Sequence, residues 1–235
     1  KNEKDTGVCK KLTEHPQKPV TKAKPTTTRP KKSYRASQKR EMTRAFKQDA
    51  FESAAWKVFS GIGLDAATVR DIVALSNVSP GSFYNYYKTK EAIFDIILVK
   101  VAQRVRGAAR QARSEEDDLD AMLQKSQCAA FRELLSIHGA PHFLELNQHH
   151  IRAKLFNMSE TREMLDDLKQ NLLRLVPMKN TSPERMDFIA AAVLTTALEG
   201  LLYIARNPLV DIDQTSHLTA GMAAAGIRAA AAAAG

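Results

Sequence analysis

The chain has 235 residues, a formal net charge of +9 and two cysteines, Cys9 and Cys128. The length suffices for one or two domains with a hydrophobic core, and two distant cysteines exclude a disulfide framework. The most apolar stretch, residues 189–204, is too short for a membrane span and contains Glu199. The N-terminus lacks the apolar segment of a secretory signal. We therefore expect a cytoplasmic protein.

The basic character of the chain is concentrated at its N-terminus. Residues 1–44 contain fourteen Lys or Arg and four acidic residues, a net charge of +10, so the remainder carries −1. Residues 1–37 are rich in Lys, Thr and Pro and poor in large apolar residues, which predicts a disordered basic tail. Two interpretations stay open for this tail: an arm that follows DNA phosphates or enters a minor groove, or an unstructured extension.

Beyond the tail, Ala, Leu, Arg and Glu dominate and strand-like alternation is absent, which predicts an all-α fold. A first helix is predicted from Gln38 to Ser60, ended by Gly61 and Gly63. Helical spacing assigns its core face to Phe46, Ala50, Phe51, Ala54, Ala55, Val58 and Phe59. The pattern does not decide whether Trp56 packs inside or lies at the surface.

The next stretch predicts two short helices joined by a tight turn. Thr68 is placed to cap the first helix, with Asp71 three residues later, and Asn77 can adopt the left-handed conformation that ends it. The apolar face of this helix is assigned to Val69, Ile72, Val73 and Leu75.

A second start signal follows at Ser79 and Pro80, and predicts a recognition helix over residues 79–87. Phe83 and Tyr87 are four residues apart and should face inward. The outward face then carries hydroxyls, an amide and a glycine but no charge, which suits contacts with base edges and phosphates. Those outward residues are Gly81, Ser82, Tyr84, Asn85 and Tyr86. Thr89 should cap a further helix, with Lys90 in its first turn where a phosphate could bind.

These motifs resemble the helix-turn-helix of the tetracycline-repressor (TetR) family. The resemblance runs from about residue 50 to 94, and its matching segments are residues 54–55 (AA), 58–59 (VF), 68–72 (TVRDI), 78–79 (VS), 81–87 (GSFYNYY) and 90–91 (KE). Ala67, Asn77 and Tyr87 depart from the usual Thr, Gly and Phe. The resemblance implies DNA contacts from Thr68, Arg70, Pro80, Gly81, Ser82, Tyr84, Asn85, Tyr86 and Lys90.

The remainder predicts a larger helical domain after a connecting helix from Thr89 to Arg113. Gly, Pro and capping residues predict five further helices, over residues 119–138, 141–157, 159–175, 183–206 and 215–234. The expected domains are a tail (1–37), a three-helix helix-turn-helix domain (38–98) and an effector-binding and dimerisation domain (99–235).

The helices over residues 183–206 and 215–234 contain many small residues, among them Ala190, Ala197 and Gly200. The resemblance implies that they form a four-helix interface with a second subunit. The alternative is that the first of them is an interior helix of a monomer.

The histidines are the best candidates for other chemistry. His138, His142, Glu145, His149 and His150 lie close in sequence, but Gly139 and Pro141 interrupt the helix, and adjacent histidines should point about 100° apart. We therefore expect no metal site. The chain also lacks a nucleophile elbow, a phosphate-binding Gly loop and paired carboxylates, so neither a cofactor nor an enzymatic activity is expected.

The resemblance further implies a pocket for a small-molecule effector in the larger domain. Candidate lining residues, each of which could instead be core, are Met122, Phe131, His142, Phe143, Phe156, Met164 and Tyr203. The predicted function is a ligand-responsive, sequence-specific transcriptional repressor that binds a palindromic operator in double-stranded DNA as a homodimer. The alternative is an architectural DNA-binding protein that uses the basic tail and has no effector.

Overall fold

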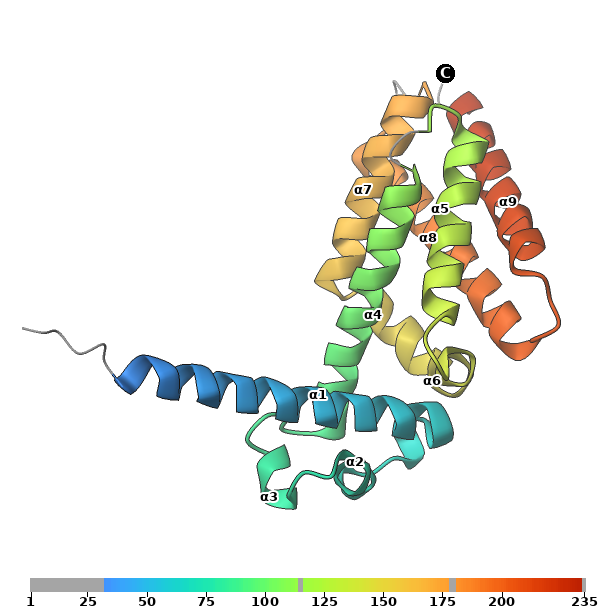
Figure 1. Ribbon diagram of the computed structural model, residues 1–235. Coiled ribbons are helices and arrows are strands. Elements are labelled where there is room, and N and C mark those ends of the chain that lie inside the picture. The colour runs from blue at the N-terminus through green and yellow to red at the C-terminus, as the bar shows by residue number, and fades with distance from the viewer. Residues whose placement is uncertain (1–31, 114–115, 178–180, 234–235) are drawn as a thin grey trace, which may run out of the picture. The chain divides into compact units, whose positions relative to one another are not determined.

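A computed structural model of the protein describes residues 32–113, 116–177 and 181–233. Within these ranges all regular structure is α-helical, which confirms the predicted fold class (Figure 1). The helices are α1 (Lys32–Ala66), α2 (Val69–Ser76), α3 (Pro80–Phe83), α4 (Lys90–Arg113), α5 (Leu119–Leu135), α6 (Ala140–Leu155), α7 (Ser159–Leu175), α8 (Pro183–Arg206) and α9 (Ile212–Ala232).

The chain divides into two units, Lys1–Arg40 and Glu41–Gly235. The described part of the first unit is helical from Lys32, so the predicted disorder is wrong for residues 32–37, and residues 1–31 of the predicted tail lie outside the described residues. The second unit contains both hydrophobic cores. Helix α4 runs through the boundary predicted at residue 98, and that domain division stays a prediction.

Helix α1 does not end at Gly61, as the sequence predicts, but continues to Ala66 with a break at Gly63. Gly61 is exposed with open space around its Cα, and one helical glycine costs only about 1 kcal/mol. Gly63 has φ 76° and ψ 165°, a combination that is nearly exclusive to glycine. It turns the backbone, so that the last residues of α1 lead directly into α2.

The first core surrounds the C-terminal half of α1. Phe51, Phe59, Phe83 and Phe94 are fully buried there together with Ile72. The inward faces predicted for α1, α2 and α3 are largely confirmed, with two exceptions: Phe46 is 72% exposed and Leu75 is 55% exposed. The helical spacing of apolar residues continues along α1 and α2 beyond the part of each helix that another described element covers. The predicted core faces are therefore too long.

Helices α5 to α9 form the remainder of the second unit, and their boundaries follow capping chemistry. The side chains of Asp118, Ser182 and Asp211 accept hydrogen bonds from the first turns of α5, α8 and α9. Helix α7 differs: Met158 occupies its N-cap position without a side-chain hydrogen bond, and Ser159 is its first helical residue. The ends predicted for α5 and α6 are two or three residues late, and α9 begins three residues before the predicted Thr215.

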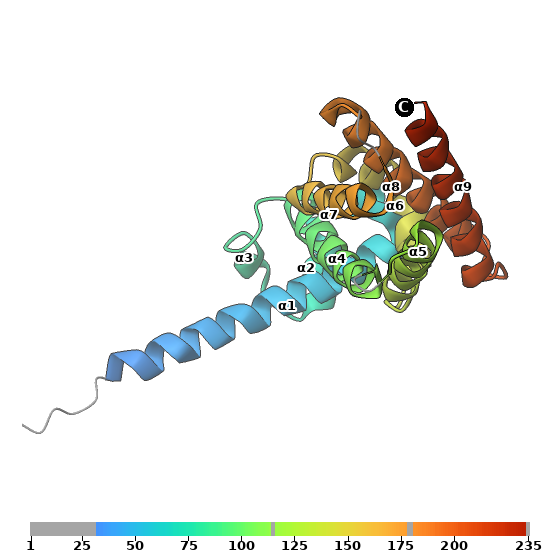
Figure 2. The same ribbon diagram turned by 90° about the horizontal axis from the view of Figure 1, so that it is seen from above.

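Helix α8 packs against α6, α7 and α9, and α5 lies beside α4 and α9 (Figure 2). In length and composition α8 could also cross a membrane, but core helices of soluble proteins pass the same test. Gly200 marks the closest packing of α8. A Cβ atom at Gly200 would lie 2.9 Å from Thr219 Cγ2 of α9 and 3.1 Å from Phe131 Cζ of α5. The missing side chain of Gly200 therefore serves packing within one chain.

We expect Gly200→Ala to lower the free energy of unfolding by about 1–3 kcal/mol, because the added methyl group overpacks the contact of α8 with α5 and α9. Gly107→Ala is the matched control. Gly107 also lies inside a helix but has no neighbouring atom within 4 Å, so its replacement should be neutral or stabilise by up to about 1 kcal/mol. Urea unfolding of the two variants measures both values. Equal stability of the two variants would contradict the packing assigned to Gly200.

Candidate nucleic-acid interface and interior cavity

Helix α2 begins with the predicted capping box. Thr68 Oγ1 accepts a hydrogen bond from Asp71 N at 3.2 Å, and Thr68 N donates to Asp71 Oδ2 at 2.8 Å. Hydrogen bonds from Thr68 lower the pKa of the Asp71 carboxyl, which favours its charged form. Asn77 ends the helix with φ 55°, in the expected left-handed region. Local sequence therefore fixes both ends of α2.

The recognition stretch is shorter as a helix than predicted. Helix α3 ends at Phe83, and residues 84–86 form a turn where the sequence predicts helix to residue 87. Phe83 and Tyr87 still face inward, with ring centroids 5.3 and 6.4 Å from that of Phe51. Tyr87 donates a hydrogen bond to Glu52 at 3.0 Å, and burial together with this bond raises the pKa of its hydroxyl. Packing against α1, not helix length, orients the stretch.

The outward face of this region is exposed and carries little charge. Tyr84 is 65% exposed, whereas Ser82 and Tyr86 are half-buried, and Ser82 Oγ lies 2.9 Å from Ser79 Oγ. In Figure 1, α2 and α3 lie at the N-terminal end of α4, away from α5, α7 and α9. The exposed residues predicted to contact DNA are Thr68, Arg70, Pro80, Gly81, Tyr84 and Asn85.

Lys90 differs from its expected role as a phosphate ligand. Its ammonium group donates hydrogen bonds to the carbonyl oxygens of Leu64 at 2.8 Å, Asp65 at 3.1 Å and Ala67 at 2.8 Å. An ammonium group has three N–H donors, so its donor capacity is fully used at the junction of α1 and α2. The side chain of Lys90 is structural, and only its backbone N–H at the start of α4 is placed for an anion.

Asn147 of α6 holds the other side of the same junction. Its Oδ1 accepts from Leu64 N at 2.7 Å, and its Nδ2 donates to Phe59 O at 3.0 Å and to Phe143 O at 2.8 Å. The residue is fully buried. Gly63 diverts the backbone from helical geometry, so backbone groups near it need hydrogen-bond partners outside α1. The side-chain amide of Asn147 supplies such partners.

Trp56 makes a second link between α1 and α6. Its ring stacks on Phe143 with centroids 4.3 Å apart, and its Nε1 donates to His138 O at 2.7 Å. The sequence does not decide whether Trp56 packs inside or lies at the surface. These two contacts show that it packs.

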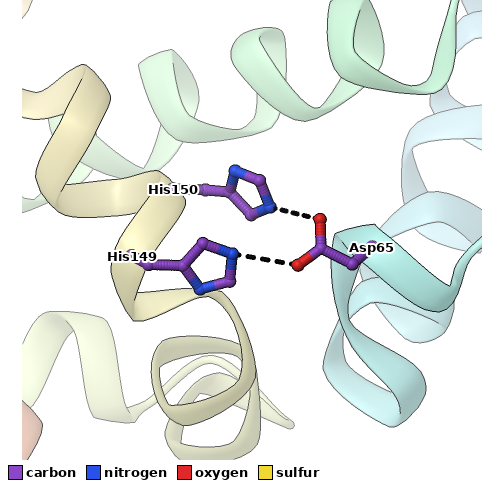
Figure 3. Close-up of side chains that lie close together, drawn as sticks. All are labelled: Asp65, His149 and His150. Atoms are coloured by element: carbon purple, nitrogen blue, oxygen red, sulfur yellow. Dashed lines mark hydrogen bonds and ion pairs between the residues drawn. The ribbon is translucent and has the colours of Figure 1, made fainter.

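His149 and His150 make a third link, at the protein surface. Their Nε2 atoms lie 2.9 and 2.8 Å from the two carboxylate oxygens of Asp65 (Figure 3). Hydrogen bonding from His150, followed by the weaker influence of His149, lowers the pKa of Asp65. The expectation that the adjacent histidines diverge is wrong, because both rings turn toward α1. These three ligand atoms lie within 4.8 Å of one another and could hold a metal ion, but they already satisfy each other with hydrogen bonds.

A cavity of about 160 Å³ lies among α4, α5, α6, α7 and α8, with an almost entirely apolar lining. Of the seven residues predicted to line an effector pocket, Phe131, Phe143 and Met164 line this cavity. The other four do not. Met122 belongs to the separate second core, and His142, Phe156 and Tyr203 are exposed. Residue type alone does not indicate which face of α6 and of α8 points toward the cavity.

Sequence reasoning missed two polar residues that lie on buried helical stripes. Arg113 continues the stripe of Leu98, Ala102 and Ala109 along α4, and is only 4% exposed. Asn147 lies on the same face of α6 as Phe143 and Ile151. A polar residue in phase with an apolar stripe was the signal that could have identified both.

The sequence model of the bacterial regulatory proteins of the tetR family matches residues 53–97. Residues 53–97 therefore form a helix-turn-helix domain of the tetR type. A domain of this type is that of a DNA-binding transcription regulator. No curated protein sequence matches the chain.

Solved structures of TetR-family proteins share the fold. The fatty acid degradation regulator FadR from Bacillus halodurans is 18% identical, with a TM-score of 0.57, over 77% of this chain and 96% of its own. A TetR family transcription regulator from Marinobacter aquaeolei VT8 is 22% identical, with a TM-score of 0.57, over 78% and 96%. A tetR-family transcriptional regulator from Streptomyces coelicolor is 15% identical, with a TM-score of 0.57, over 80% and 82%.

We expect Asn147→Ala to lower the free energy of unfolding by about 1–3 kcal/mol, because Leu64 N and Phe59 O lose a buried partner. Gln148→Ala is the matched control, since the Gln148 side chain bonds only within its own helix and its loss should cost less than about 0.5 kcal/mol. Urea unfolding followed by circular dichroism gives both values. If Asn147→Ala lowers the free energy of unfolding no more than the control does, the Asn147 amide does not stabilise the junction.

Proposed function

We propose that the protein is a cytoplasmic, ligand-responsive repressor that binds a palindromic operator as a homodimer. The observation that carries this proposal is the uncharged outward face of the recognition stretch, residues 80–86, within the segment that matches the tetR family model. A solvent-facing helix without Lys or Glu is suited to a DNA groove, where amide and hydroxyl groups meet bases and phosphates.

Individual roles follow from chemistry and exposure. Asn85 is proposed to read adenine through its amide, and Gly81 allows close approach of the backbone. Thr68, Arg70 and Tyr84 are proposed to contact phosphates. Pro80, Ser82 and Tyr86 complete the surface, and Lys90 contributes through its backbone N–H instead of its ammonium group.

Dimerisation through residues 183–206 and 215–234 is supported by an exposed apolar face on α8 and α9. Phe188 is 74% exposed, and Met222 of α9 lies across a groove whose floor includes Ala191 and Ala192. The hydroxyl of Thr195 bonds back to Ala191 O, which leaves this face without unmet donors. Exposed apolar surface of this kind is typical of a subunit interface. Two heads of one dimer would then read half-sites about 34 Å apart.

Coupling between effector and operator is proposed to pass through Phe143. This residue lines the cavity on one side and stacks on Trp56 of α1 on the other. A ligand that displaces Phe143 would disturb α1, on which α3 packs. Binding of the effector would then lower the affinity for the operator, and binding of the operator would lower the affinity for the effector by the same factor.

The architectural alternative is favoured by one observation, the net charge of +10 within residues 1–44. Such a protein would bind DNA mainly through phosphates, with a steep dependence on salt and little sequence preference.

Selection of bound duplexes from a random pool at physiological salt distinguishes the two functions. We expect recovery of a palindrome with half-sites about one helical turn apart. Tight binding at low salt without any enriched sequence would instead support the architectural function. On the recovered site, Asn85→Ala should cost about 1–3 kcal/mol at a single base position. A uniform loss over all sequences would assign Asn85 to the DNA backbone.

We expect Trp56→Leu to weaken effector-driven release of the recovered operator without weakening effector binding. The substitution removes the stacking contact with Phe143, and Trp56 itself does not line the cavity. Release is followed by fluorescence anisotropy of a labelled operator, and ligand binding by calorimetry. Phe46→Leu, at an exposed position of the same helix α1, is the control. Parallel loss of ligand affinity and release in Trp56→Leu would indicate damage to the core instead of a broken coupling.

A further inference from the structure

The apolar cavity contains three buried polar groups whose hydrogen-bonding capacity is not used among the described residues. They are Nε and Nη2 of Arg113, Nε2 of Gln127 and Oγ1 of Thr161. All three residues are at least nine-tenths buried. Unpaired polar groups are costly in an interior, so a cluster of donors around one cavity indicates a missing polar partner.

Arg113 is the strongest of these groups. Nε and Nη2 carry the two parallel N–H bonds along one edge of the guanidinium, the edge that binds a carboxylate in bidentate fashion. Among the described residues, the carboxylate of Asp167 lies 3.5 Å from Nη2 and makes no hydrogen bond with it. Asp167 instead accepts a bond from Arg106 Nε at 2.8 Å.

The carboxylate beside Arg113 is also shared with a second guanidinium group. Arg106 pairs with Glu163 as well as with Asp167, so one shared carboxylate faces two guanidinium groups. Burial, opposed by Asp167 and reinforced by Arg106 and Arg110, lowers the pKa of Arg113. An additional anion at this position would meet the unused hydrogen bonds of Arg113 and offset its unfavourable interaction with Arg106 and Arg110.

We propose that the effector of this regulator is a small carboxylic acid with an apolar chain, and that its carboxylate binds the Nε/Nη2 edge of Arg113. This inference rests on the proposed function, because it assigns a chemical class to the effector of that cavity. The chain of the ligand lies against the apolar side chains of α4 to α8, and Thr161 and Gln127 supply further donors near its path.

The cavity volume limits the size of this ligand. An apolar cavity of about 150 Å³ accommodates a benzene-sized molecule, so about 160 Å³ suits on the order of six to ten non-hydrogen atoms. A straight-chain acid of about six to eight carbons falls in this range. A larger amphiphile would have to expand the cavity.

The first experiment compares head groups at constant chain length on the unaltered full-length protein. Hexanoate, octanoate, 1-octanol and octylamine are titrated by calorimetry and by fluorescence of Trp56, the single tryptophan, which stacks on the cavity residue Phe143. We expect octanoate to bind about tenfold or more tightly than 1-octanol, and octylamine to bind weakest, because charge-assisted hydrogen bonds are the strong ones.

Two variants then locate the anion. Arg113→Gln should weaken octanoate binding about tenfold to a hundredfold and leave 1-octanol binding unchanged. Arg110→Gln is the matched control: it removes the same charge from the same end of α4, but from an exposed side chain, and should change octanoate affinity less than twofold. Circular dichroism verifies that each variant is folded, and the head-group comparison needs no variant.

The inference is overturned if 1-octanol binds as tightly as octanoate, if no acid binds, or if Arg113→Gln binds octanoate like the unaltered protein. Equal losses in the Arg113 and Arg110 variants would also overturn it, because they would indicate a general effect of charge. Failure here is distinct from failure of the proposed function, which the duplex selection tests without any ligand.

Discussion

The junction between α1 and α2 is the constraint on which the arrangement of the second unit depends. Gly63 breaks the helical path there, and a broken helix end leaves backbone donors and acceptors that must find other partners. Lys90 of α4 binds three of the carbonyl oxygens, and Asn147 of α6 binds Leu64 N. One strained glycine thus joins the helix-turn-helix to two helices of the larger domain. The surface contact of Asp65 with two histidines of α6 reinforces the same joint.

This junction gives the helix-turn-helix a defined position without a large interface. An unmet buried polar group costs about 1–3 kcal/mol. Displacement of α6 or α4 from α1 therefore breaks individual hydrogen bonds at a defined cost, instead of reducing contact gradually. Two arrangements separated by such penalties can behave as a switch, whereas a purely apolar contact could slide. Polar bonds at the junction and apolar stacking of Trp56 on Phe143 therefore differ in role: the bonds define positions, and in the proposed coupling the stacked rings would transmit displacement from the cavity.

Sequence reasoning was most successful where structure is local. The capping box at Thr68, the left-handed Asn77 and the Ser182 cap depend on neighbours a few residues away, and all were predictable. It failed where a distant element decides. Phe46 has the right period for a core residue, but no other element in the described part of the chain covers it. Lys90 looks like a phosphate ligand by position, yet carbonyl groups 23 to 26 residues earlier in the chain use its donors. Which of the candidate aromatic residues enter the cavity likewise depends on helix rotation, which no local motif encodes.

The placement of the cavity explains why a small ligand could affect a distant surface. Leu98 and Val101 of α4 and Phe143 and Leu144 of α6 all line it, and these are the two helices whose Lys90 and Asn147 hold the junction. Interiors are packed nearly as densely as crystals, so an occupant that exceeds the cavity of about 160 Å³ must displace the side chains that line it. Such an occupant would move side chains on α4, on α6 or on both. Either displacement acts on the same few hydrogen bonds at the end of α1, and the joint that positions the recognition stretch is also the point at which that position can be changed.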